Sequence, residues 1–148
     1  MNKKKIILGI LIVLWLCIIW GHSMQPAVVS EQESGKLLAI LGKIFPALLN
    51  TDLGMFIVRK AAHFTEYLIL GILLGSYFSM IERGALQRFI TPTFSGLAIA
   101  FIDETIQMFV VGRSGEIRDM WIDFGGVALG VLITLAIINN RGRGRRSY

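Results

Sequence analysis

Six ionisable side chains stand inside or at the edge of apolar stretches in this sequence. They are His63 and Glu66 in one stretch, Asp103 and Glu104 in the next, and Asp119 and Asp123 at the start of the last. A charged side chain at the centre of a bilayer costs about 3 kcal/mol or more, so such residues usually face the interior of a helical bundle and mark a functional site. The pattern therefore predicts a polar site inside an otherwise apolar protein.

Arginine and amide side chains near these acids complete the candidate site. Arg59 lies one helical turn before His63, and Gln107 lies one turn after Asp103, followed by Arg113. Guanidinium groups bind phosphate and carboxylate through paired hydrogen bonds. The candidate site contains nine residues: Arg59, His63, Glu66, Asp103, Glu104, Gln107, Arg113, Asp119 and Asp123.

One chemistry open to this set is phosphate chemistry. Arg59 and Arg113, with Arg118 as a third candidate, would clamp a phosphate group. His63 would act as general acid or base, oriented by Glu66 one turn later. Asp103 or Glu104 would serve as the second carboxylate or as the nucleophile.

Two other interpretations of the same residues stay open. A divalent cation is one of them, with the ligands His63, Glu66, Asp103 and Asp123. The structural alternative is a pair of salt bridges, Arg59 with Glu66 and Arg113 with Asp103, that only hold the helices together. The sequence leaves the cofactor and the metal dependence undetermined.

The composition indicates that these groups are positioned by membrane helices. The chain has 148 residues, of which 54% are hydrophobic and only 17% are charged, and its mean hydropathy is +0.65. A soluble domain has about a quarter of its residues charged. We therefore expect an all-α membrane protein with a single domain over residues 1–148. Its basic ends are better explained by membrane topology than by nucleic-acid binding.

Hydropathy predicts four transmembrane helices, at about 6–21, 61–81, 94–111 and 120–138. The first is short and follows three lysines, so a cleaved signal peptide is the alternative to a retained span. Between the first two spans, apolar residues recur at helical spacing, which predicts a short amphipathic helix in the interface that Pro46 bends or ends. A re-entrant segment is the alternative there. Residues 141–148 are expected to be a disordered basic tail.

The distribution of positive charge predicts the orientation. Four spans place both termini on one side, and nine of the fifteen lysines and arginines then fall on that side. They are Lys3, Lys4, Lys5, Arg83, Arg88, Arg141, Arg143, Arg145 and Arg146. Because cytoplasmic segments are rich in lysine and arginine, we expect both termini in the cytoplasm.

Helix geometry predicts that the polar groups share a depth and face one another. At about 1.5 Å per residue, Glu66 lies about 10 Å below Arg59, and Asp103 about 15 Å below Arg113. Glycines continue the same helix faces towards the cytoplasm, as Gly71-x-x-x-Gly75 and Gly126-x-x-x-Gly130, and permit close helix approach. The sequence thus predicts a tightly packed inner half below a polar outer pocket.

These motifs resemble the VanZ-like family of small bacterial membrane proteins. The resemblance rests on Arg59-Lys60-x-x-His63-Phe64-x-Glu66-Tyr67, on Asp103-Glu104-x-x-Gln107 with Gly112-Arg113, and on Asp119-x-x-x-Asp123-x-x-Gly126-x-x-x-Gly130. It implies a multi-pass plasma-membrane protein of bacteria, in a family whose namesake is associated with lowered susceptibility to teicoplanin. Teicoplanin is a glycopeptide antibiotic that acts on cell-wall precursors outside the membrane.

Three functions fit the sequence and the resemblance. The first is an outward-facing site for an extracytoplasmic ligand, either a cell-wall precursor lipid or a glycopeptide antibiotic. The second is a membrane enzyme that hydrolyses or transfers a lipid phosphate. The third is a component of a proton-coupled transporter that uses carboxylates such as Asp103 as proton carriers. The expected partner in all three is the lipid bilayer, and the sequence does not determine the oligomeric state.

Overall fold

The computed structural model describes residues 3–46 and 51–144, with the side chains of the last helix described to residue 140. This part of the chain contains five helices and no strand, which confirms the all-α prediction. The helices are α1 (Lys3–Ser23), α2 (Ala27–Leu41), α3 (Asp52–Phe78), α4 (Ala85–Gln107) and α5 (Ile117–Gly144).

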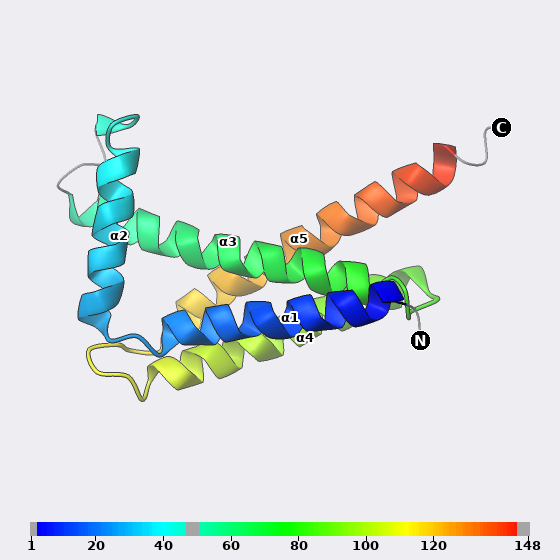
Figure 1. Cartoon of the computed structure of the whole chain (residues 1–148), viewed down its shortest axis with the longest axis horizontal. Coiled ribbons are helices and arrows are strands. Elements are labelled where there is room, and N and C mark those ends of the chain that lie inside the picture. The colour runs from blue at the N-terminus through cyan, green and yellow to red at the C-terminus, as the bar shows by residue number, and fades with distance from the viewer. Residues whose placement is uncertain (1–2, 47–50, 145–148) are drawn as a thin grey trace.

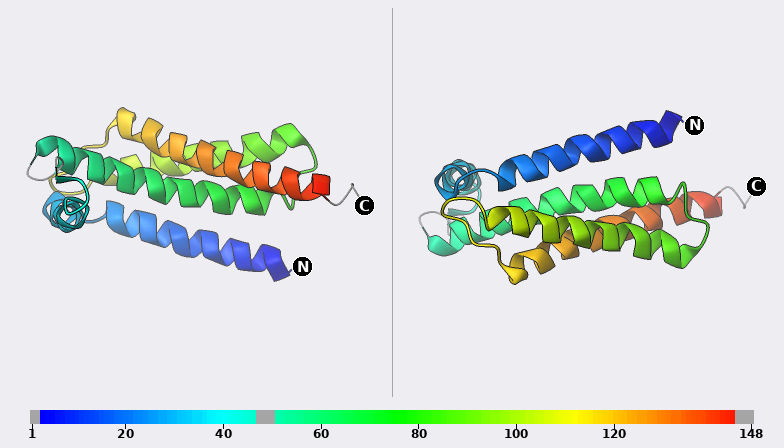
Figure 2. Two further views of the ribbon diagram at one scale, coloured as in Figure 1. Left: turned by 90° about the horizontal axis from the view of Figure 1, so that it is seen from above. Right: turned by 90° about the horizontal axis from the view of Figure 1, so that it is seen from below.

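Four long helices lie side by side, and α2 lies across one end of them (Figure 1). The chain passes along the bundle in alternating directions, so that the start of α1, the end of α5 and the α3–α4 connection lie at the end opposite α2. The views in Figure 2 place α1 on the outside of the group formed by the other three. The connection between α4 and α5 therefore lies at the α2 end, beside the connection between α1 and α2.

Within the described residues, three helices are long and apolar enough to cross a membrane. They are α1, α4 and the part of α5 that ends at Asn140. The helix α3, which carries Arg59, Lys60, His63 and Glu66 in its first half, is not among them. The predicted count of four transmembrane helices plus an amphipathic helix is thus not confirmed, although the three apolar helices support the membrane character of the protein.

Helix boundaries differ from the predicted ones for local reasons. The α3 helix begins at Asp52, because the Thr51 side chain accepts a hydrogen bond of 2.9 Å from the Gly54 N–H and caps its first turn. The α2 helix ends at Leu41, before Pro46 is reached, so Pro46 neither bends nor ends it as predicted. Pro92 lies inside α4, where it removes one backbone hydrogen bond but is itself fully buried.

The end of α5 also departs from the prediction of a disordered tail over 141–148. The helix continues to Gly144, and residues 145–148 lie outside the described part of the chain.

The closest packing joins α3 to α5 through glycines. A side chain at Gly71 would collide with the backbone of Val127, and one at Gly130 would meet the backbone of Leu68 and Ile72. These contacts confirm the close helix approach predicted from the glycine pairs. The buried core lies beside them and comprises Ile19, Tyr67, Leu70, Leu74, Ala100, Val127 and Val131.

Candidate functional site

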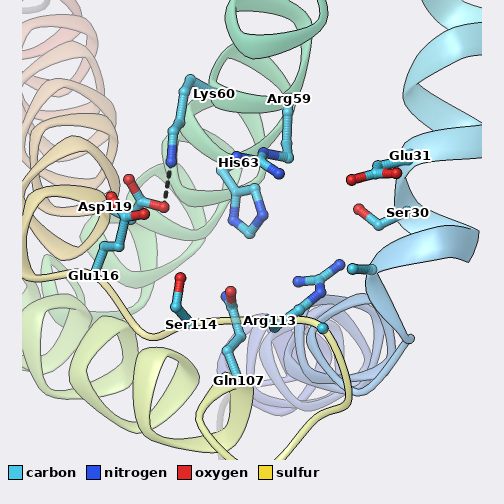
Figure 3. Close-up of a pocket in the computed structure, with 12 residues that line it drawn as sticks. Ser30, Glu31, Arg59, Lys60, His63, Gln107, Arg113, Ser114, Glu116 and Asp119 are labelled. Atoms are coloured by element: carbon cyan, nitrogen blue, oxygen red, sulfur yellow. Dashed lines mark ion pairs between the residues drawn. The ribbon is translucent and has the colours of Figure 1, made fainter.

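A pocket opens at the α2 end of the bundle, between α2, α3 and the α4–α5 loop. Its volume is about 80 Å³, and most of its lining residues are polar. The lining includes Ser30 and Glu31 of α2, Arg59, Lys60 and His63 of α3, Gln107 at the end of α4, Arg113, Ser114 and Glu116 of the loop, and Asp119 of α5 (Figure 3). A neighbouring hollow of about 190 Å³ shares Ser30, Arg59, His63 and Arg113 with it and extends towards His22 and Glu66.

Two arginines from different elements face this pocket. Figure 3 shows the side chains of Arg59 and Arg113 turned towards the space between α3 and α2, with His63 beside them. Within the described residues, neither guanidinium forms an ion pair, so the expected pairs Arg59–Glu66 and Arg113–Asp103 are not formed. Burial lowers the pKa of Arg113, the Asp103 carboxylate opposes that shift, and Arg59 adds to the lowering. The two arginines are close enough to repel each other.

The position of Arg113 depends on a left-handed backbone turn. Gly112 has a φ of +77°, a conformation that side chains other than glycine rarely adopt. The preceding residue, Val111, accepts a hydrogen bond of 3.2 Å from the Ala27 N–H at the start of α2. The loop that carries Arg113 is therefore held against α2, and both elements shape the pocket together.

A buried layer of acids lies directly beneath the pocket. Asp103 and Asp123 are fully buried, and one ligand atom from each lies within 4.8 Å of the other and of a His63 ring nitrogen. The Gln107 amide donates a hydrogen bond of 3.1 Å to one oxygen of Asp103. Four polar atoms of this layer have no hydrogen-bond partner: His63 Nδ1, Asp103 Oδ1 and both Asp123 oxygens.

The remaining acids of the predicted site form other contacts. Glu66 Oε1 lies 2.6 Å from Nδ1 of His22 on α1, and so it does not orient His63 as the sequence interpretation proposed. Glu104 accepts a hydrogen bond of 2.8 Å from the Glu116 N–H and fixes the loop before α5.

Asp119 forms an ion pair with Lys60. The structure thus gathers Arg59, His63, Gln107, Arg113 and Asp119 at the pocket and Asp103 and Asp123 beneath it, while Glu66 borders the neighbouring hollow and Glu104 lies at the loop.

A comparison with known protein families places the site in one family. The family model VanZ/LLP1 matches residues 8–139 of the chain. The chain belongs to the VanZ/LLP1 family. No curated protein and no solved structure matches it. The matched range runs from α1 through most of α5 and contains every residue of the pocket, so the site belongs to the VanZ/LLP1 domain itself.

Several residues of this VanZ/LLP1 site were missed by the sequence interpretation. Lys60 is not among the nine predicted site residues, but it is buried and its Nζ lies 5.3 Å from the centre of the Phe56 ring as well as beside Asp119. Its position three residues before His63 on the same helix face was the available signal. His22 was also missed, because its partner Glu66 lies 44 residues away in the sequence.

Proposed function

We propose that this VanZ/LLP1 protein binds the anionic group of an extracytoplasmic ligand in the pocket at the α2 end. The ligand is a phosphate of a cell-envelope precursor lipid or a carboxylate of a teicoplanin-type glycopeptide, and its binding lowers susceptibility to such antibiotics. The single observation that carries the proposal is the convergence of Arg59 and Arg113, without ion-pair partners, on one polar pocket.

The two arginines without ion-pair partners favour an anion in the pocket. Lys60 forms an ion pair with Asp119, whereas Arg59 and Arg113 form no ion pair within the described residues, although Glu31 and Glu116 match their charge in number. Guanidinium groups bind oxyanions in a bidentate way, and the desolvation of Arg113 strengthens such a contact. Hydroxyl and amide groups of Ser30, Ser114 and Gln107 supply further hydrogen bonds. The small volume suits one ionic group of a larger ligand.

We further propose that α3 crosses the membrane as the fourth span, so that the pocket faces outward and both termini lie in the cytoplasm. The arrangement of α3 beside the three apolar helices supports this topology (Figure 1). Its charged half lies at the α2 end, where neighbouring helices and the loop surround the charges. The basic residues near the termini and the α3–α4 connection support a cytoplasmic position for the opposite end. The membrane is then the bacterial plasma membrane.

Cysteine labelling tests this topology. In a Cys17→Ser background, we expect Gln32→Cys on α2 to react with a membrane-impermeant maleimide in intact cells. Asn140→Cys near the end of α5 should react only after permeabilisation, because it would face the cytoplasm. Both positions are exposed on the protein, so their difference reports the side of the membrane. Labelling of Asn140→Cys in intact cells would contradict the proposed orientation.

Binding is preferred here over catalysis and over proton transport. An enzyme acting on a lipid phosphate would use His63 as an oriented base, but Glu66 contacts His22 instead. A proton carrier would need a path of carboxylates that are free to titrate, whereas Glu66 contacts His22 and Glu104 is held by the Glu116 N–H, which leaves only Asp103 and Asp123. Neither alternative has an observation that favours it.

A pair of lipids that differ only in their headgroup tests the proposal. Full-length protein in nanodiscs is titrated with a polyprenyl phosphate and with the uncharged polyprenol of the same chain length, and bound lipid is measured by native mass spectrometry. We expect saturable binding of the phosphate and at least tenfold weaker binding of the polyprenol. Equal affinity for the two lipids would mean that the headgroup charge is not recognised.

Teicoplanin is the second arm of the same experiment. Displacement of the polyprenyl phosphate by teicoplanin would show that both anions use one site. Binding of only one of the two compounds would identify the source of the anion. Binding of neither compound would refute the proposal.

A further inference from the structure

The acids beneath the pocket form a second polar cluster that anion binding does not use. Asp103 comes from α4, Asp123 from α5 and His63 from α3, so three helices meet at this point. One ligand atom from each residue lies within 4.8 Å of the other two. We propose that this cluster is a binding site for a divalent transition-metal cation of the Mn²⁺ or Zn²⁺ type.

Unpartnered buried atoms support this assignment. Both side-chain oxygens of Asp123 and one oxygen of Asp103 lack a hydrogen-bond partner, although both residues are 0% exposed. His63 Nδ1 is also unpartnered, and it lies 4.0 Å from Asp123 Oδ1, too far for a hydrogen bond. The hydroxyls of Ser23 and Tyr67 are near enough to donate to Asp103, whereas His63 Nδ1 and both Asp123 oxygens have no such donor. A buried polar atom without a partner costs about 1–3 kcal/mol, so these three atoms around one point indicate a missing binding partner.

The charges of the neighbouring groups indicate a cation. Lys60 pairs with Asp119 and His22 with Glu66, while Asp123 has only the His63 ring at 4.0 Å beside it. Within the described residues, no lysine or arginine forms an ion pair with Asp103 or Asp123. Two buried carboxylates beside each other repel strongly unless a positive charge lies between them. A divalent cation would balance both of them.

The donor set selects the class of ion. One imidazole nitrogen with carboxylate oxygens suits Mn²⁺, Fe²⁺ or Zn²⁺ better than Mg²⁺ or Ca²⁺, which prefer oxygen alone. Two ligand atoms that bind one ion at about 2.1 Å lie at most about 4.2 Å apart, so small side-chain rotations bring all three atoms into range. Gln107 bonds the second oxygen of Asp103 and would hold that ligand in position. His63 also lines the pocket, which gives the ion a route from outside.

Manganese binding to the full-length protein in detergent micelles tests the site. The protein is stripped with a chelator and titrated with Mn²⁺, and free Mn²⁺ is measured by electron paramagnetic resonance. We expect one saturable Mn²⁺ per chain. Asp123→Asn should weaken binding by about 100-fold or more, since a direct ligand loses its charge. Glu66→Gln is the matched control and should still bind one ion, because Glu66 contacts His22 and lies outside the cluster.

A spectroscopic measurement on the wild-type protein keeps the test independent of how well the variants fold. Pulsed electron paramagnetic resonance of the bound Mn²⁺ should show hyperfine coupling to an imidazole nitrogen. The chain has only two histidines, so the coupling should survive His22→Gln and disappear in His63→Gln. Absence of saturable binding would mean that water or a shared proton occupies the cluster. Binding that survives Asp123→Asn and His63→Gln would place the ion elsewhere, and either result overturns the proposal.

The metal site and the anion site can be tested separately. Arg113→Gln should preserve or strengthen Mn²⁺ binding, because it removes a positive charge that acts on Asp103. The same substitution should weaken phosphate binding. Failure of one proposal therefore leaves the other measurable.

Discussion

Arg113→Gln is expected to weaken the binding of a polyprenyl phosphate by about tenfold to a hundredfold. A hydrogen bond to a charged group contributes about 1.5–3 kcal/mol, and each 1.4 kcal/mol is a factor of ten in affinity. Arg113→Lys should fall between the wild type and the glutamine variant, because lysine keeps the charge but loses the two-pronged geometry. Titration of the nanodisc-embedded protein measures each affinity.

The same variants should change antibiotic susceptibility in a sensitive bacterial host. We expect Arg59→Gln and Arg113→Gln to lose protection against teicoplanin while the amount of protein in the membrane stays near the wild-type level. Arg118→Gln is the matched control, since Arg118 is exposed in the first turn of α5 and does not line the pocket. If Arg118→Gln causes the same loss, or if protection falls only as protein level falls, the arginines act through folding or overall charge.

Gly71→Leu is expected to cost about 3 kcal/mol or more, and to prevent folding of much of the protein. Even the first carbon of a side chain at this position collides with the backbone of Val127, so α3 and α5 must separate. A backbone cannot give way as a flexible side chain can. Since a protein of this size is stable by about 5–15 kcal/mol, the loss is a large part of the total. Melting temperature and monodispersity in size-exclusion chromatography measure it.

A second glycine offers the control for this prediction. Gly21 lies in α1, and a side chain there meets nothing within 4 Å. Gly21→Leu makes the same chemical change in a membrane helix and should leave the melting temperature close to the wild-type value. If both variants melt alike, the glycines of α3 and α5 are not needed for close packing.

The polar groups of the site lie between the glycine contacts of α3 and α5 on one side and the α4–α5 loop on the other, and this arrangement holds them in place. The glycine contacts fix α3 against α5 below the polar groups, so His63 and Asp123 are brought to the same height without direct hydrogen bonds between them. The Glu104–Glu116 contact fixes the loop above. His63 and Asp123 are thus held in place by the packing around them rather than by a hydrogen bond between them.

The sequence was sufficient to predict the helical segments and the faces that the polar residues share. Hydropathy and helical spacing are local properties, so runs of apolar residues and repeats of three and four residues identify them directly. The glycine spacing on α3 and α5 likewise predicted their close approach, because the absence of a side chain acts at short range. Seven of the nine predicted site residues lie at the pocket or directly beneath it for this reason.

The partners of the ionisable groups were decided only by the tertiary structure. Spacing along one helix places Glu66 beside His63, but the rotation of α1 brings His22 to Glu66 instead. The ion pair between Lys60 and Asp119 likewise joins residues far apart in the sequence. Each residue turns a helix by about 100°, so the group that faces a given side chain depends on how neighbouring helices are rotated and docked.

The same physical reason applies to the position of α2 across the end of the bundle and to the turn at Gly112. Both depend on contacts between distant segments, which periodicity along the chain does not encode.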